Sequence, residues 1–146
     1  MQLALVGISH KTAPVEIRER FAFNGDVLRG ALTSLVSSKE ITEVMILSTC
    51  NRVEVVAESP DDRRLREFLC EFHRIPQDTI SQHLYTLRNA EAIRHIFRVT
   101  SSLDSMMVGE PQILGQVKEA YRIATDAGTV GMNLSALMSR AFAVAK

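Results

Sequence analysis

Four short runs of apolar and β-branched residues most constrain what this chain can fold into. Residues 3–8 are continuously apolar, and residues 44–47 and 53–57 are rich in valine and isoleucine. Runs of this length bounded by turn-forming residues are typical of strands, and a continuous apolar run indicates a strand buried in a sheet. A fourth strand is expected around residues 83–87. The core is therefore expected to form around a four-stranded sheet.

Helical patterns separate these runs. Thr12 and Pro14 predict a first helix start, and Asp26 is expected to cap a second helix. The second helix would bury one stripe: Val27, Leu28, Ala31, Leu32, Leu35 and Val36. Residues 59–61 open a third helix with Leu65, Phe68, Leu69 and Phe72 on its core face. The order β-α-α-β-β-α-β predicts an α+β sandwich, an antiparallel or mixed sheet covered by helices on one face.

From about residue 89 to residue 146 the pattern is helical only. Asn89 is expected to cap a helix whose apolar positions are Ile93, Ile96, Phe97 and Leu103. Glu110 and Pro111 predict the start of the next helix, and Gly128 predicts its end. A last helix begins near Asn133 or Ser135 and reaches Lys146 without a closing glycine or proline.

Length and composition predict one soluble, intracellular domain. The chain has 146 residues, with 17 basic and 17 acidic side chains. This balance argues against a dedicated nucleic-acid binder, whose usual mark is a basic excess. Two cysteines form neither a zinc site nor a disulfide framework, so no metal is expected. The start lacks a signal-peptide pattern, and no run suggests a membrane span, so a cytoplasmic location is expected.

Cys50 is the first candidate for chemistry. It lies between two predicted strands, in a tight connection where a reactive atom is well presented. Thr49 and Asn51 are turn-forming neighbours, and the charge of Arg52 would favour the thiolate. The alternative is a buried, inert cysteine, which is common for this residue type. Cys70 falls away from the apolar stripe of its helix and is interpreted as incidental.

Two further groups of residues could contribute. Among the four histidines, His95 is the first candidate because it lies on the flank of its helix, about 120° from the centre of the apolar stripe, where it could face a cleft. His10 is the second candidate. The segment 105–112 joins two helices, and its helix start offers free backbone N–H groups for a carboxylate or phosphate. Gln112 and Gln116 share one helical face. An ordinary interhelical turn is the alternative for this segment.

Three sequence blocks together resemble one family. They are G-I-S-H-K-T-A-P-V-E-I-R-E at 7–19, I-L-S-T-C-N-R-V-E at 46–54 and S-S-L-D-S-M-M-V-G-E-P-Q-I-L-G-Q-V-K at 101–118. In this order they resemble glutamyl-tRNA reductase, as does E-A-I-R-H at 91–95. The match covers the family's N-terminal catalytic domain and the start of a long connecting helix. The resemblance implies a ferredoxin-like sandwich, with the NADPH-binding and dimerisation domains absent from this chain.

The resemblance also implies roles for single residues. Cys50 matches the family's nucleophile and His95 a histidine important for activity. The positions that match substrate-binding residues are Thr49, Asn51, Arg52, Ser105, Glu110, Pro111, Gln112 and Gln116. The seven glycines form neither G-x-G-x-x-G nor a P-loop, so no cofactor-binding residue is expected in this chain.

The implied reaction is acyl transfer followed by reduction. The Cys50 thiolate attacks glutamyl-tRNA to give a glutamyl thioester, and hydride from NADPH, held by another domain, gives glutamate-1-semialdehyde for tetrapyrrole synthesis. The partners implied are glutamyl-tRNA, a second copy of the full-length enzyme and the downstream aminomutase, with no membrane. Two alternatives stay open, a single-domain thiol hydrolase or acyltransferase and a non-catalytic module that recognises tRNA or protein.

Overall fold

The central sheet has four strands, and every pairing in it is antiparallel. A computed structural model of the chain describes residues 1–103 and 112–145. The strands are β1 (Leu3–Ser9), β2 (Glu43–Ser48), β3 (Arg52–Glu58) and β4 (Tyr85–Arg88), in the order β2-β3-β1-β4. All four predicted strands are confirmed, and the sheet is antiparallel rather than mixed.

Seven helices surround this sheet in the described residues. They are α1 (Val15–Arg20), α2 (Gly25–Val36), α3 (Arg63–His73), α4 (Gln77–Ile80), α5 (Ala90–Thr100), α6 (Gln112–Asp126) and α7 (Met132–Ala145). The four-residue helix α4 was not predicted, because it is too short to show a helical period. The predicted starts at Glu110 and Pro111 lie outside the described residues. Gly128 ends α6 as predicted, with a left-handed φ of 77°.

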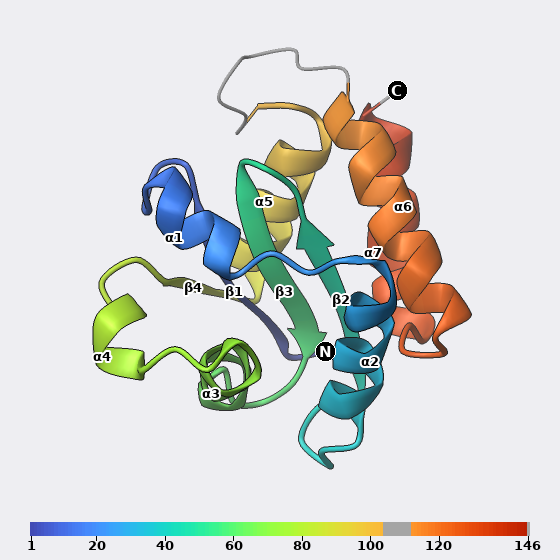
Figure 1. Cartoon of the computed structure of the whole chain (residues 1–146). Helices are drawn as coiled ribbons and strands as arrows, with labels where there is room; N and C mark the ends of the chain where they lie inside the picture. Colours follow the sequence, from blue (N-terminus) through green and yellow to red (C-terminus); the bar gives the residue numbers. More distant parts are fainter. Residues whose placement is uncertain (104–111, 146) are drawn as a thin grey trace.

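Helices cover both faces of the sheet, so the expected single covered face is wrong. Figure 1 shows α2 in front of the sheet and α5 behind it. On the side of α5, Met45 and Val56 of the sheet line a cavity of about 20 Å³ with Ile96, Val117 and Met138 of α5, α6 and α7. β1 is buried along its whole length. Its continuous apolar run, without alternation, fits a strand covered on both faces.

Three smaller expectations about helix residues are corrected. Asp26 lies in the first turn of α2, while Asn24 holds the N-cap position. Val27 is 50% exposed and Leu103 is 56% exposed, so neither belongs to the core. Leu103 lies beyond the end of α5. A helical wheel places residues on a face, but it does not show where a helix ends or where a neighbouring element stops covering it.

A buried carboxylate anchors the last helix. Glu43 of β2 accepts backbone N–H groups of Gly131 at 2.7 Å, Asn133 at 3.2 Å and Leu134 at 2.9 Å. The first N–H groups of a helix have no partner within the helix, and a negative charge there is stabilising. Thr129 adds a backbone pairing between its carbonyl and Val44 N at 2.9 Å. The start of α7 is thereby joined to the edge of the sheet.

Candidate active site

The exposed thiol of Cys50 lies at the tip of the β2–β3 hairpin, as predicted. The N–H of Thr49 donates to the carbonyl of Arg52 at 2.8 Å. Oγ1 of Thr49 accepts the N–H groups of Asn51 at 3.1 Å and Arg52 at 3.2 Å. Threonine hydroxyls often bind nearby backbone groups in turns. These bonds close the turn, and Cys50 is exposed at its tip.

The segment after β1 holds this turn from the side. The N–H of His10 donates to the carbonyl of Asn51 at 2.8 Å. Nε of Arg18, on α1, donates to the carbonyl of Cys50 at 3.2 Å, and its Nη1 donates to the carbonyl of Ala13 at 2.7 Å. The first and second sequence blocks therefore meet in space. Sequence reasoning missed Arg18. The helix that carries it has only six residues, which is too short for its pattern to show that this cation lies on the inner face.

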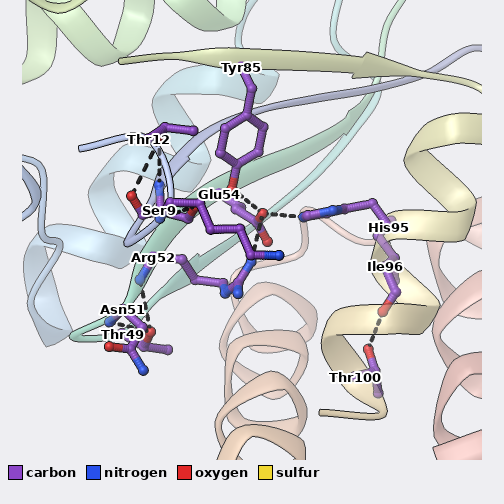
Figure 2. A network of polar contacts seen from close by, with 11 residues as sticks. Ser9, Thr12, Thr49, Asn51, Arg52, Glu54, Tyr85, His95, Ile96 and Thr100 are labelled. Atoms are coloured by element: carbon purple, nitrogen blue, oxygen red, sulfur yellow. Dashed lines mark hydrogen bonds and ion pairs between the residues drawn. The ribbon is translucent and has the colours of Figure 1, made fainter. Parts of the chain in front are cut away.

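Arg52 and Glu54 form an ion pair inside the molecule. Arg52 is 1% exposed and Glu54 is 2% exposed, and Arg52 Nη1 lies 3.3 Å from Glu54 Oε2. Both side chains extend toward the face of the sheet that α5 covers (Figure 2). The structure thus directs the Arg52 charge to Glu54. The predicted effect of this charge on the Cys50 thiol stays a prediction.

Glu54 is the centre of a polar cluster that joins three elements. Its Oε2 accepts hydrogen bonds from Arg52 and from the hydroxyl of Tyr85 on β4, and it pairs with Nε2 of His95 on α5 (Figure 2). The Tyr85 and His95 rings pack edge to face, with centroids 5.7 Å apart. Sequence reasoning missed Glu54 and Tyr85. The signal for Glu54 was an acidic residue within an otherwise apolar predicted strand, because a buried carboxylate requires hydrogen-bond or charged partners. No comparable signal in the sequence indicated Tyr85.

The partners of Glu54 keep it ionised. Burial acts to raise the pKa of this carboxyl group, but the hydrogen bond and charge of His95 oppose it. The charge of Arg52 and the hydrogen bond of Tyr85 act in the same direction, and together they hold the pKa of Glu54 below its usual value. At neutral pH the cluster therefore contains a carboxylate that only accepts hydrogen bonds.

That His95 faces a cleft stays a prediction. Its side chain is 14% exposed and lies against the sheet, paired with Glu54. His83 uses Nδ1 to bind the carbonyl of Thr12 at 2.9 Å. His73 packs among the rings of Phe21, Phe23 and Phe72. Of these three histidines, His95 is the one that pairs with a buried acid.

The predicted residues near the start of α6 are only partly described. Ser105, Glu110 and Pro111 lie outside the described residues. Gln112 is exposed, and Gln116, one turn later, is half-buried. α6 packs against β2, the strand that leads to Thr49. The hairpin tip lies at the same end of the fold as the end of α5 and the start of α6 (Figure 1).

Residues 1–103 and 112–145 contain neither a cluster of metal ligands nor a helix that could span a membrane. These residues contain no group of three or more histidine, cysteine or acidic side chains arranged to hold a metal ion. None of the helices formed by this described part combines the length and the apolar character needed to cross a bilayer.

Comparisons with known proteins identify the family of the chain. Residues 6–146 match the family model described as the N-terminal domain of glutamyl-tRNA(Glu) reductase. Glutamyl-tRNA reductase 2 of Koribacter versatilis is 54% identical over all of this chain and 34% of the relative, and glutamyl-tRNA reductase of Pelobacter propionicus is 51% identical with the same coverage. The solved glutamyl-tRNA reductase from Methanopyrus kandleri superposes with a TM-score of 0.79 at 40% identity, over 97% of this chain and 32% of that one. The chain thus spans about a third of the length of these relatives. It belongs to the family of glutamyl-tRNA reductase N-terminal domains.

Proposed function

We propose that this chain carries out the acyl-transfer step of glutamyl-tRNA reduction. The thiolate of Cys50 attacks the ester carbonyl of glutamyl-tRNA, a carbon–sulfur bond forms, and the tRNA hydroxyl leaves. A thiol suits this step because it is a strong nucleophile toward an ester and a good leaving group afterward. The observation that carries the proposal is the exposed Cys50, held by the bonds of Thr49 and Arg18, in a chain of this family.

The remaining site residues are proposed to bind the glutamyl group and to assist the transfer. Arg52 offers a planar fork that can bind both oxygens of a substrate carboxylate, and its pair with Glu54 orients the guanidinium. Thr49 and Asn51 flank the nucleophile. His95 positions or protonates the reacting groups. We place Ser105, Glu110, Pro111, Gln112 and Gln116 as further substrate contacts, consistent with the position of α6 beside β2.

The second step is proposed to need a domain outside this chain. NADPH bound there would supply the hydride that releases the acyl group from Cys50 as glutamate-1-semialdehyde, which enters tetrapyrrole synthesis. In the whole protein we propose a homodimer that passes its product to the aminomutase in the cytoplasm. This chain contributes the thiol, the carboxylate-binding Arg52 and the oriented His95.

We also propose that the sheet and its first helices form a ferredoxin-like sandwich. The β2-β3-β1-β4 order with antiparallel pairing supports this assignment. So does the element order, in which helices join β1 to β2 and β3 to β4 while a tight hairpin joins β2 to β3. Helices α5, α6 and α7 would then be an addition that covers the second face.

The test is to trap the thioester. Glutamyl-tRNA labelled in its glutamyl group should transfer the label to the chain in a form that hydroxylamine releases. Cys50→Ser should abolish labelling without unfolding the chain. Cys70→Ala is the matched control, because Cys70 is buried and the pKa of its thiol is raised by burial and by Glu71. Labelling that persists in Cys50→Ser and disappears in Cys70→Ala would refute the proposal.

A further inference from the structure

Glu54 and Tyr85 lie in one row across the sheet, with Gly7 between them. Gly7 is the direct partner of Glu54 on β3 and of Tyr85 on β4. Direct partners on neighbouring antiparallel strands extend to the same face of the sheet. Because Gly7 has no side chain, the Tyr85 ring reaches across β1 to the Glu54 carboxylate. A Cβ atom at position 7 would lie 2.8 Å from Glu54 Cγ.

The row determines which nitrogen of His95 carries a proton. Glu54 is ionised at neutral pH, so its Oε2 can only accept hydrogen bonds. Its three partners, Arg52, Tyr85 and His95, must therefore all act as donors. A neutral imidazole has one N–H group and one bare nitrogen. In the neutral ring the proton must be on Nε2, and Nδ1 is the bare nitrogen.

We infer that Glu54 is a positioning residue whose carboxylate, braced by Tyr85 across Gly7, holds the His95 proton on Nε2 and leaves Nδ1 as the ring nitrogen that exchanges protons in the reaction. The inference rests on the proposed thiol chemistry for its catalytic consequence. The tautomer itself depends only on the cluster. Nε2 is fully engaged inside the molecule, so the chemistry of His95 proceeds through the other nitrogen.

The first experiment reads the tautomer directly. The ring ¹⁵N shifts of His95 in the labelled chain, recorded at a pH where the ring is neutral, distinguish an N–H nitrogen from a bare one. Wild type should show Nε2–H. Glu54→Gln should show a mixture of tautomers, because an amide can present either its oxygen or its NH₂ group to the ring. Glu43→Gln is the matched control, since Glu43 is also a buried glutamate but binds α7, and it should leave the His95 spectrum unchanged.

The second experiment measures the consequence for catalysis. The rate of thioester formation from glutamyl-tRNA should fall roughly tenfold or more in Glu54→Gln, because His95 is then no longer oriented as a proton-transfer group. Tyr85→Phe keeps the ring and removes one donor, so its rate should fall several-fold with an unchanged substrate KM. Tyr121→Phe is its control, because it removes the hydroxyl that meets Ser135 Oγ at 2.9 Å between α6 and α7. Its rate should equal that of wild type.

The outcomes separate this inference from the proposed function. A neutral His95 in wild type that carries its proton on Nδ1 overturns the inference. So does a normal rate in Glu54→Gln or, if that variant does not fold, in Tyr85→Phe. A different result would refute the proposed function, namely thioester formation that persists in Cys50→Ser. The tautomer measurement requires no substrate and decides its part of the inference in either case.

Discussion

The buried carboxylate of Glu54 fits on one face of the sheet because its partner on the neighbouring strand, Gly7, has no side chain. A Cβ atom at Gly7 would lie 2.6 Å from the backbone oxygen of Val53 as well as close to Glu54. A backbone oxygen in a central strand cannot move without disturbing its pairings. The glycine is therefore required by its neighbours, although it adopts an ordinary strand conformation.

Gly7→Ala is expected to destabilise the fold. Overpacking of this kind costs about 1–3 kcal/mol, and urea unfolding measures it as a lower transition midpoint. Gly30→Ala is the control, because a Cβ atom there meets nothing within 4 Å. In α2 this change should stabilise the chain by about 0.5–1 kcal/mol. Equal midpoints for Gly7→Ala and wild type would contradict the close packing around Glu54.

Arg52→Lys separates charge from geometry. Lysine keeps the positive charge but loses the planar fork that binds both carboxylate oxygens. The KM for glutamyl-tRNA should rise about tenfold, which corresponds to about 1.4 kcal/mol, while the labelling of Cys50 by a thiol reagent should change little. Arg63→Lys is the control, since its side chain is 69% exposed in a surface ion pair. Thiol labelling that falls in parallel with substrate binding would assign Arg52 to the nucleophile instead.

His73 makes stability depend on pH. Burial among phenylalanine rings lowers the pKa of His73, against a raising effect of a hydrogen bond with the Phe21 backbone. The unfolded chain then binds the proton more readily than the folded chain. Stability is therefore expected to fall as pH drops from the ordinary value of 6.5 through the lowered pKa. His73→Phe should lose less melting temperature between pH 8 and roughly pH 5 than wild type does. An identical pH dependence would show that His73 does not titrate differently on folding.

At the scale of elements, the start of α7 depends on a strand residue far away in sequence. Glu43 receives three backbone N–H groups at that helix start, and a Cβ atom at Gly131 would lie 2.9 Å from its carboxyl carbon. The carboxylate and the glycine thus fit each other. Together they determine the direction in which α7 leaves the sheet.

Glu43→Gln should weaken this junction. Glutamine keeps the shape but loses the negative charge at a helix N-terminus and presents an NH₂ group to N–H donors, so a cost of about 1–3 kcal/mol is expected. Hydrogen exchange should show faster opening at the first turn of α7 than in β1. Glu40→Gln, at an exposed position in the turn before β2, should match wild type. Unchanged protection of α7 in Glu43→Gln would show that packing alone holds the helix.

At the scale of the whole molecule, the chain is expected to perform half of a reaction. Because it has no glycine-rich dinucleotide motif, NADPH should not change its melting temperature, since a ligand stabilises only what it binds. If Cys50 forms the proposed thioester, water is the nucleophile expected to resolve it, and the chain should slowly release glutamate and tRNA. Semialdehyde measured with this chain alone would place the cofactor site within residues 1–146.

The sequence by itself determined the four strands, the longer helices and the position of the thiol, but not the four-residue helix α4. Residues 3–8, 44–47 and 53–57 indicate their strands without knowledge of their neighbours, because burial of a short apolar run and the hairpin between two runs are local properties. Cys50 follows from the same local pattern, since it lies between two such runs. The resemblance to glutamyl-tRNA reductase added expected roles that no spacing could supply, and these stay proposals. Those roles concern Arg52 and His95 above all.

Only the tertiary structure decided how the polar residues are paired. Glu54 bonds to Tyr85 and His95 across 31 and 41 residues of chain, and Glu43 reaches the start of α7 across 88 to 91 residues. Such pairs depend on strand register and on which helix covers which face, and neither has a periodic signal in the sequence. A helical wheel placed His95 at a flank, but the partner that orients its ring is a strand residue. The strand order sets Gly7 of β1 between Glu54 of β3 and Tyr85 of β4, and this leaves room for the hydrogen bond between their side chains.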